Sequence, residues 1–285
     1  MSKPVLTVRQ AQKSGTQKLS AISGIDNALE SAVLLAHAVQ KDRSWLYAWP
    51  ESDLSSKQQL HFEKYLQRRL DGEPVSYITG YREFWGLDLR VSTETLIPRP
   101  ETELLVETAL SKVDEKAAKV LELGTGTGAI SVALSAERPA WKILVTETDA
   151  SALAIARENF KKYNLRIDTA LSNWFENTPD EKFDLIISNP PYIESDDPHL
   201  QQGDLRFEPL AALASGKDGL DAIREITQQA ANHLSKQGWL MLEHGYNQGK
   251  AVFTLFQRSG FSSIETLNDL SGNDRITIGQ PCKKP

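Results

Sequence analysis

The feature that most restricts the fold of this chain is a regular alternation of strand-like and helix-like segments from residue 101 onward. Apolar runs rich in Val, Ile and Leu predict strands within residues 118–124, 141–147, 166–174, 183–192 and 238–245. Segments with apolar residues at helical spacing lie between them, within residues 129–139, 150–163, 219–235 and 247–260. Residues 261–280 predict two further strands, joined by a short loop and antiparallel at the sheet edge. Together these segments predict a doubly wound, mostly parallel α/β sheet of seven strands.

Residues before about 80 predict a smaller domain made of helices. One helix is expected over residues 26–40, with Asp26 as its N-cap. Another is expected over residues 55–70, where Ser55 and Gln58 have the spacing of a capping box. Both segments repeat apolar residues at helical spacing, so each helix has one face to bury against the other.

The segments around these helices predict connections. The aromatic residues 44–50 predict a turn that packs the two helices together, and glycine and proline interrupt residues 71–80. Residues 82–91 partly alternate between apolar and polar side chains, which predicts a two-stranded hairpin. We therefore expect an N-terminal helical domain that recognises the substrate, a β-hairpin linker and a catalytic domain, over residues 1–80, 81–100 and 101–285.

Charge and composition exclude several classes of protein. The 285-residue chain has a formal net charge of -6, whereas proteins that grip long nucleic acid usually have a basic surface, so no stable nucleic-acid partner is expected. The single cysteine, Cys282, and the scattered histidines lack the spacing of metal ligands, so no metal site is predicted. No apolar run has transmembrane length and the first ten residues contain no apolar signal core. We expect a monomeric, cytoplasmic protein without a membrane partner.

A glycine-rich turn between the first strand and the first helix of this sheet predicts a ligand site. Gly124, Gly126 and Gly128 allow positive φ angles and a close approach of the backbone to a ligand. A phosphate-binding loop is excluded because no lysine follows Gly128, but a dinucleotide-binding turn is not. Glu147, at the end of the next strand, is positioned to bind ribose hydroxyls, and Asp149 is the competing candidate. The turn therefore predicts an adenosine-containing ligand.

The segment Asn189-Pro190-Pro191-Tyr192 follows another strand, and should face the same crevice. The side-chain oxygen of Asn189 and the carbonyl oxygen of Pro190 are hydrogen-bond acceptors, and the proline rings restrict their directions. Tyr192 offers a flat ring for stacking. Two acceptors and a ring suit a planar group that carries an NH2, with the nitrogen left open to a methyl donor.

These strings of residues resemble the release factor glutamine methyltransferase family. The resemblance rests on "ELGTGTG" and "NPPY", and further on "GYREFWGLDLRVSTETLIPRPETE", "SNWF", "NPPYIESDDPHLQQGDLRFEPLAAL" and "LEHG". It implies a class I S-adenosylmethionine-dependent methyltransferase fold, which is Rossmann-like. The implied reaction moves a methyl group from S-adenosyl-L-methionine to N5 of the glutamine in the Gly-Gly-Gln motif of class I peptide chain release factors. It leaves S-adenosyl-L-homocysteine and modulates translation termination.

The resemblance also implies roles for individual residues. The methionine part of the cofactor would lie against Gly124, Thr125, Gly126, Thr127 and Gly128. Its ribose would contact Glu147, its adenine Trp174, and its methyl end Asn189. The glutamine would be bound by Asn189, Pro190, Pro191 and Tyr192, with Asn189 and Pro190 as the catalytic pair. The family often has aspartate in place of Glu147 and Asn173, and residues 98–103 resemble a loop at the mouth of the cofactor site or a structural end of the hairpin.

The expected mechanism is the positioning of a weakly nucleophilic amide nitrogen. Glu243 or His244 could act as a general base, but the structural end of a strand is the favoured interpretation of both residues. An adenine-N6 DNA methyltransferase would need the same grip on an NH2 group, but the acidic charge and the lack of a long basic insertion argue against it. Three more classes of protein compete with this interpretation: a ribosomal RNA amino-methyltransferase, a nicotinamide oxidoreductase and a non-catalytic adenosine-binding regulator. A nicotinamide oxidoreductase would have no evident use for the Pro190-Pro191 corner.

Overall fold

A computed structural model describes residues 5–113 and 116–282, and the chain divides into two compact units. The first unit comprises Met1–Tyr81 together with Gln202–Phe207, and the second comprises Arg82–Gln201 together with Glu208–Pro285. Residues 1–4, part of the segment in which no signal core is expected, lie outside the described residues. Among the residues described, no helix has both the length and the apolar character that a membrane span requires.

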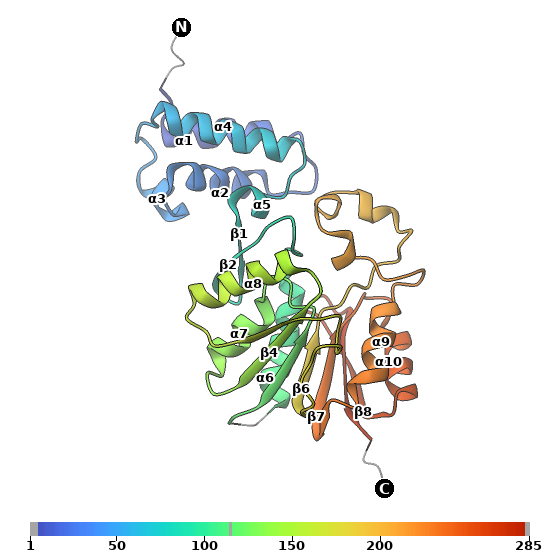
Figure 1. Ribbon diagram of the computed structural model, residues 1–285. Coiled ribbons are helices and arrows are strands. Elements are labelled where there is room, and N and C mark those ends of the chain that lie inside the picture. Colours follow the sequence, from blue (N-terminus) through green and yellow to red (C-terminus); the bar gives the residue numbers. More distant parts are fainter. Residues whose placement is uncertain (1–4, 114–115, 283–285) are drawn as a thin grey trace. The chain divides into compact units, whose positions relative to one another are not determined.

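The first unit is a bundle of helices (Figure 1). Its helices are α1 (Val8–Leu19), α2 (Asn27–Val39), α3 (Arg43–Ala48), α4 (Ser56–Leu70) and α5 (Val75–Thr79). Asp26 caps α2 by accepting hydrogen bonds from the N–H groups of Ala28 and Leu29, and Ser55 with Gln58 forms the capping box of α4. Both predicted caps are confirmed.

The turn predicted for residues 44–50 is wrong in its first part, because a short helix forms there. Asp42 accepts a hydrogen bond from the N–H of Trp45 at 2.9 Å, and this cap starts α3. Leu46 is buried in the apolar core that α1, α2 and α4 share. Burial of Leu46 together with a good N-cap therefore stabilises a six-residue helix that the sequence pattern alone did not indicate.

A buried arginine ties the segment Gln202–Phe207 into this unit. Arg69, near the end of α4, is 4% exposed and forms ion pairs with Glu30 of α2 and with Asp204. Arg206 donates a hydrogen bond to the backbone oxygen of Asp71 at 3.0 Å. A buried guanidinium needs such partners, because an unpaired charge in the core costs several kcal/mol.

The second unit contains the predicted seven-stranded sheet, preceded by a hairpin of β1 (Tyr81–Phe84) and β2 (Leu87–Arg90). The sheet strands are β3 (Lys119–Leu123), β4 (Lys142–Glu147), β5 (Asp168–Leu171), β6 (Phe183–Ser188), β7 (Leu234–Glu243), β8 (Phe261–Asn268) and β9 (Asp274–Pro281). Its helices are α6 (Glu103–Lys112), α7 (Ala129–Glu137), α8 (Ala150–Lys162), α9 (Asp221–Ala230) and α10 (Gly249–Arg258). Short 3-10 helices cover Pro100–Thr102, Pro198–Gln201, Leu205–Phe207 and Leu210–Ala212, of which Leu205–Phe207 belongs to the first unit.

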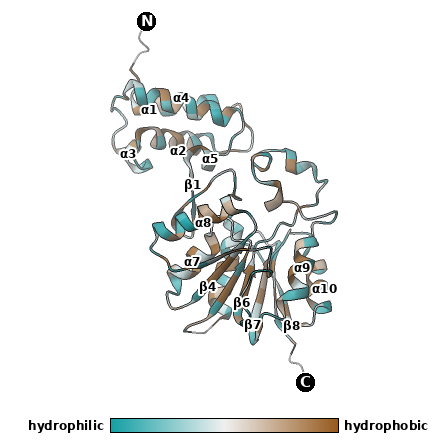
Figure 2. Ribbon diagram, in the orientation of Figure 1, coloured by the Kyte–Doolittle hydropathy of each residue, from teal (hydrophilic) through white to brown (hydrophobic). Residues whose placement is uncertain are grey.

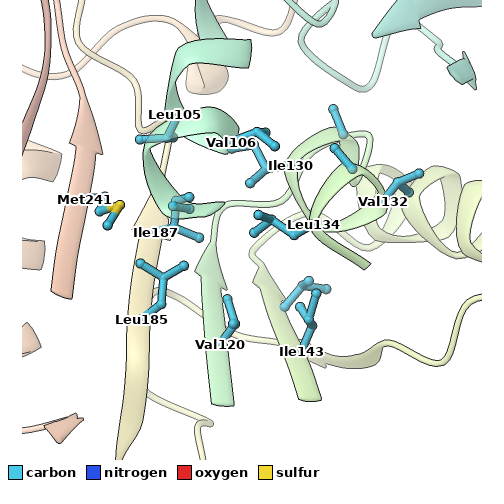
Figure 3. Close-up of a cluster of buried hydrophobic side chains, with 14 of the residues drawn as sticks. Leu105, Val106, Val120, Ile130, Val132, Leu134, Ile143, Leu185, Ile187 and Met241 are labelled. Atoms are coloured by element: carbon cyan, nitrogen blue, oxygen red, sulfur yellow. The ribbon is translucent and has the colours of Figure 1, made fainter. Parts of the chain in front are cut away.

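The strand order is β5-β4-β3-β6-β7-β9-β8, with β9 antiparallel to both of its neighbours and every other pair parallel. Helices α6, α7 and α8 cover one face of the sheet, and α9 and α10 cover the other (Figure 1). Alternate residues of each strand serve the two faces: Val120 and Leu185 contribute to the first core, and Leu121 and Ile186 to the second. Figure 3 shows the first core, and Figure 2 shows the apolar strands between helices whose outer faces are polar. The predicted fold class is confirmed.

The helix predicted over residues 219–235 is wrong at its end. Helix α9 ends at Ala230, and Leu234 already pairs with Phe183 as the first residue of β7. Both side chains are buried in the second core, so strand pairing stabilises an extended backbone where the apolar spacing of the sequence still suited a helix. The strand predicted over residues 166–174 is likewise shorter, because regular pairing with β4 ends at Leu171.

Candidate functional site

The candidate site lies at the carboxyl ends of three neighbouring parallel strands, β3, β4 and β6. Leu123 is aligned with Thr146 on β4, and the N–H groups of Gly124 and Thr125 donate hydrogen bonds to the Thr146 carbonyl oxygen at 2.9 and 3.0 Å. On the other side of β3, the hydroxyl of Ser188 donates to the carbonyl oxygen of Leu123 at 2.7 Å. These bonds bring the chain segments that follow the three strands to one edge of the sheet, where ligands of open α/β sheets bind.

A cavity of about 340 Å³ opens at this edge. Most of the residues predicted for the site line it, namely Gly124, Thr125, Gly126, Thr127, Glu147, Trp174, Asn189, Pro190 and Pro191. Gly128 and Tyr192 are the two predicted site residues that do not. The cavity also has walls that the sequence analysis did not predict, formed by Glu94–Leu96 and by Pro209 with Ala211 and Ala212. Its size is typical of a site for a small molecule.

Two glycines of the turn, Gly124 and Gly128, have different structural roles. At Gly124, φ is +67°, a backbone conformation that favours glycine, and the Trp174 ring lies 3.4 Å from where a Cβ would be. At Gly128, φ is +79°, and a Cβ would meet the ring of Phe160 at 2.5 Å. Gly128 therefore starts α7 and packs it against α8, which explains why it lies outside the cavity wall.

Asn159 of α8 holds the turn from behind, and the sequence analysis missed it. It is fully buried, and its Nδ2 donates hydrogen bonds to the carbonyl oxygens of Thr127 at 2.8 Å and Arg90 at 3.0 Å. Its Oδ1 accepts from the N–H of Arg90 at 2.7 Å. An asparagine on the inner face of an amphipathic helix was the available signal, because a buried amide requires polar partners.

The structure gives different contacts to Glu147 and Asp149, the two candidates for the predicted ribose contact. Glu147 is partly buried, and its carboxylate accepts hydrogen bonds from the N–H groups of Gly126 at 2.9 Å and Thr148 at 2.8 Å. Asp149 also lines the cavity, but it caps α8 by accepting from the N–H groups of Ser151 and Ala152 at 2.7 and 3.0 Å. The role of Asp149 in starting the helix leaves Glu147 as the carboxylate that belongs to the glycine turn.

Asn189 is oriented by a residue of the loop before α6. Its Nδ2 donates a hydrogen bond at 3.1 Å to Oγ1 of Thr102, which is 4% exposed. Arg99, in the same loop, lines the cavity and pairs with the buried Glu208. The loop over residues 98–103, for which the sequence left two roles open, thus lines the cavity through Pro98, Arg99 and Thr102 and also supports its walls.

Tyr192 lies behind the cavity wall. Its ring packs against the second core, and its hydroxyl donates a hydrogen bond to Oε1 of Glu243 at 3.3 Å. Burial raises the pKa of the Tyr192 phenol. Within the part of the chain that the structure describes, Tyr192 is not among the residues lining the cavity, so the stacking role predicted for it has no support from this arrangement.

The two candidates for a general base also lie outside the lining. Glu243 is 1% exposed, and burial raises its pKa to about 7, whereas the nearby Thr102 hydroxyl, the charge of Arg275 and the hydrogen bond from Tyr192 oppose the shift. His244 is fully buried, with Nε2 2.9 Å from the Thr277 hydroxyl and Nδ1 2.9 Å from the Gly245 carbonyl oxygen. Burial lowers the pKa of His244, so its imidazole is neutral near pH 7. Neither group is placed to take a proton from a molecule in the cavity.

Inside the cavity, Glu122 of β3 is a second buried carboxyl group. Burial raises its pKa to about 7, although hydrogen bonds from the hydroxyl and the N–H of Ser131 favour the charged form. The nearby charge of Glu147 raises the pKa further. Glu122 lies two residues before Gly124. In the sequence, it was recognisable only as an acidic residue inside an apolar strand.

The residues of the cavity suit S-adenosylmethionine. The carboxylates of Glu147 and Asp149 are opposite in charge to the sulfonium and ammonium groups of this cofactor. Trp174 provides an aromatic face beside Gly124. Over residues 5–113 and 116–282, no cluster of three or more His, Cys, Asp and Glu side chains could hold a metal ion.

Comparisons with known proteins identify the family. A family described as methyltransferase small domain matches residues 100–203, and one described as PrmC N-terminal domain matches residues 10–80. A release factor glutamine methyltransferase from Pseudomonas aeruginosa is 49% identical over 253 residues, which cover 88% of this chain and 92% of that protein. The enzyme of the same name from Aliivibrio fischeri is 42% identical over 277 residues, which cover 96% and 98%.

A solved structure agrees in fold. The crystal structure of a methyltransferase from Pyrococcus furiosus matches 77% of this chain and 99% of its own with a TM-score of 0.54 at 18% identity. The predicted class of enzyme, an S-adenosylmethionine-dependent methyltransferase, is confirmed by the family models and relatives together. With a predicted fold that the structure reproduces and relatives that match nearly its whole length, this chain belongs to the release factor glutamine methyltransferase family.

Proposed function

We propose that this protein transfers a methyl group from S-adenosyl-L-methionine to N5 of the glutamine in the Gly-Gly-Gln motif of class I peptide chain release factors. The observation that carries the proposal is that one cavity is lined by both the glycine turn and the Asn189-Pro190 corner. The turn suits the cofactor, and the corner suits an NH2 group. The names of the relatives indicate that this NH2 group belongs to a glutamine of a release factor.

On the cofactor side, residues 124–127 supply a backbone surface, Glu147 a carboxylate and Trp174 an aromatic face. A carboxylate can accept hydrogen bonds from two neighbouring hydroxyl groups, which suits a ribose. Bound S-adenosylmethionine supplies an electrophilic methyl group on a sulfonium. The position of Glu147 at the end of β4 places its side chain next to the turn that it also holds.

On the glutamine side, Asn189 and Pro190 orient the amide. Thr102 accepts the hydrogen bond from Nδ2 of Asn189, so the amide oxygen of Asn189 is the group available as an acceptor. Together with the carbonyl oxygen of Pro190, it can hold the two hydrogens of the glutamine NH2. An amide nitrogen is a poor nucleophile because its lone pair is delocalised. Alignment with the methyl group is therefore the main contribution, which in favourable cases is worth about 7 kcal/mol or more.

We further propose that the helical unit of residues 1–81 binds the body of the release factor. Tyr47 and Trp49 support this role, because they are 71% and 58% exposed at and beyond the end of α3, and exposed aromatic residues are typical of binding surfaces. Tyr47→Ala with Trp49→Ala should raise KM for the whole release factor and leave KM for a short Gly-Gly-Gln peptide unchanged. An equal rise in both values would contradict the proposal.

One assay tests the reaction itself. The protein is incubated with labelled S-adenosylmethionine and, in parallel, with a class I release factor, duplex DNA and ribosomal RNA. Label should appear in the release factor, on the glutamine of its Gly-Gly-Gln motif, and be absent when this glutamine is replaced by asparagine. Label in DNA or ribosomal RNA, with none in the release factor, would overturn the proposal.

The remaining part of the proposal concerns state and location. We propose a monomer that acts in the cytoplasm, where release factors work on ribosomes, and that forms no stable complex with nucleic acid. The net charge of -6 supports the last point. Sedimentation of the purified protein with and without duplex DNA should give the mass of one chain, 31.7 kDa, in both cases.

A further inference from the structure

A buried glutamine precedes α10, and the methyl transfer proposed for the cavity gives it no role of its own. Gln248 is only 9% exposed and stands immediately before Gly249, the first residue of that helix. Its side chain does not cap the helix. Glutamine is mostly found on protein surfaces, and a buried amide requires polar partners, so the partners of this amide indicate what it does.

The amide of Gln248 connects the segments that follow β6 and β7 with the segment before α9. Its Nε2 donates hydrogen bonds to the carbonyl oxygens of Tyr192 at 2.9 Å and Asp218 at 3.3 Å. Its Oε1 accepts a hydrogen bond from the N–H of Gly245 at 2.8 Å. A backbone N–H can only donate and a carbonyl oxygen can only accept, so these partners determine which way the amide faces. Both hydrogens of Nε2 have an acceptor.

Gly219 leaves the space that this amide occupies. Its φ is +71°, and a Cβ there would lie 2.2 Å from the carbonyl oxygen of Tyr192 and 2.7 Å from Nε2 of Gln248. Any other residue at this position would therefore push the chain away from both atoms. The segment before α9 approaches the end of the Asn189-Tyr192 corner closely, and Gln248 satisfies the carbonyl oxygens that meet there.

The last residue of the Asn189-Tyr192 corner is bonded on both sides. The carbonyl oxygen of Leu213 accepts hydrogen bonds from the N–H groups of Tyr192 at 3.2 Å and Ile193 at 2.8 Å. Because Gln248 bonds the carbonyl oxygen of Tyr192, the peptide groups before and after this residue both have partners. The corner is thus held where it ends as well as where it leaves β6.

The prolines of the corner make this second point of attachment important. Pro190 and Pro191 have no N–H, so neither can be held by donating a backbone hydrogen bond. Their rings fix φ, and a residue that precedes a proline is restricted to ψ of about 120–160°, which applies to Asn189 and Pro190. This range still lets the Pro190 carbonyl oxygen swing by about 40°. Catalytic groups need to be held within about 10–20°, so the corner has to be fixed at its end as well.

We infer that Gln248 is a positioning residue for methyl transfer: by bonding the Tyr192 carbonyl oxygen, it fixes the corner with the Pro190 carbonyl oxygen directed at the substrate NH2 group. This role rests on the proposed function, because that function assigns the NH2 group to a glutamine. Within the described part of the chain, Gln248 is not among the residues that line the cavity. It therefore acts through the backbone of the corner and makes no contact with the reacting atoms.

The variant Gln248→Glu tests this role with little change of shape. It keeps an oxygen for the N–H of Gly245, but an ionised carboxylate has no hydrogen to donate to Tyr192. Above neutral pH, kcat for methylation of the release factor should fall at least about tenfold. The dissociation constant of S-adenosylhomocysteine should stay within about twofold. Gln257→Glu makes the same change at an exposed position of α10 and should alter neither value. A normal kcat in Gln248→Glu would overturn the inference.

Acid should partly rescue Gln248→Glu, because a protonated carboxyl group regains one hydrogen to donate. A buried carboxyl group that faces carbonyl oxygens favours its neutral form, so the introduced glutamate should have a pKa above the usual value of about 4.3. The kcat of Gln248→Glu, divided by that of the wild type at the same pH, should rise as pH falls from about 8 to about 6. A ratio that stays constant would contradict the role of the donated hydrogen bond.

Asn159→Asp separates positioning from a general loss of structure. Asn159 is also a buried amide that donates to two carbonyl oxygens and accepts from one backbone N–H, but it holds the glycine turn. Asn159→Asp should therefore raise the dissociation constant of S-adenosylhomocysteine about tenfold and lower kcat less than Gln248→Glu does. Urea unfolding gives the loss of stability in each variant. The same pattern of kinetic and binding changes in both would mean that Gln248 only supports the fold, which would overturn the inference.

A measurement without any methyl acceptor separates this inference from the proposed function. In protein labelled with 13C at tyrosine carbonyls and 15N at isoleucine, the linked pairs are Tyr77-Ile78 and Tyr192-Ile193. Ile193→Val removes the second signal and so assigns it. Above neutral pH, Gln248→Glu should shift the Tyr192 carbonyl signal, which loses a hydrogen-bond donor, and leave that of Tyr77 unchanged.

The two possible failures are then distinct. If the release factor received no label, the proposed function would fall, and the carbonyl signal would still show whether Gln248 holds the corner. If the release factor is methylated but the Tyr192 signal is the same in the wild type and in Gln248→Glu, the inference is refuted and the proposed function stands.

Discussion

Glu147 accepts a hydrogen bond at 2.9 Å from the backbone N–H of Gly126, so the acid at the end of β4 holds the turn that follows β3. The same carboxylate accepts from the N–H of Thr148 through its other oxygen. Glu147 therefore has two roles in the proposed cofactor site: it shapes the glycine turn, and it presents a carboxylate beside that turn.

This double role predicts the effect of Glu147→Ala. The dissociation constant of S-adenosylmethionine should rise about 10- to 100-fold, because a hydrogen bond to a charged group is worth about 1.5–3 kcal/mol. Titration calorimetry measures it. Asp149→Ala is the comparison: loss of the α8 N-cap should lower stability by about 1 kcal/mol, with a smaller effect on the dissociation constant. A larger effect of Asp149→Ala on cofactor binding would reverse the preference for Glu147.

A second prediction concerns Asn189. If its oxygen aligns the substrate NH2, Asn189→Ala should lower kcat at least about 100-fold, and the dissociation constant of the cofactor should stay nearly unchanged. Asn173→Ala is a matched control, because Asn173 also lines the cavity but is exposed and its amide donates only a long bond, 3.4 Å, to Glu176. Steady-state kinetics compares the two. Loss of cofactor affinity with a normal kcat in Asn189→Ala would argue against the assigned role.

A third prediction separates strain from steric overlap at Gly128. Gly128→Ala combines a positive φ with a Cβ 2.5 Å from Phe160, whereas Gly86→Ala has a similar φ of +71° and no atom within 4 Å of its Cβ. Strain alone costs about 1–2 kcal/mol, and the overlap should add at least about 1 kcal/mol at Gly128. Urea unfolding gives both values. Equal destabilisation would mean that the contact with Phe160 is unimportant.

The buried carboxyl group of Glu122 predicts how stability depends on pH. Its pKa is raised from 4.5 to about 7 in the folded protein, so between these values the folded state binds more protons than the unfolded state. The contribution of Glu122 to the free energy of unfolding therefore falls as pH rises from 4.5 to 7. Glu122→Gln should gain stability relative to the wild type over this interval, measured by urea unfolding at several pH values. The exposed Glu107→Gln serves as the control and should show no such gain.

Much of the architecture could be predicted because the signals are local. The spacing of the apolar residues in "VLELG" and "AISVAL" reflects which side of a strand or helix is buried. This spacing can be read directly from the sequence. The caps at Asp26 and Ser55 are equally local, since each side chain bonds an N–H within three residues. The end of α9 was missed because Leu234 pairs with Phe183, far away in the sequence.

The candidate site divides in the same way. The sequence alone placed a glycine turn and an Asn-Pro-Pro corner at the same sheet edge, because parallel strands present their carboxyl ends together. Their contacts with cofactor and glutamine stay predictions. Only the tertiary structure turned Tyr192 toward Glu243, packed Gly128 against Phe160, and joined Asn189 to Thr102. These are contacts between buried polar groups or close-packed surfaces far apart in the chain, and their partners depend on how the layers come together, which no local pattern of residues records.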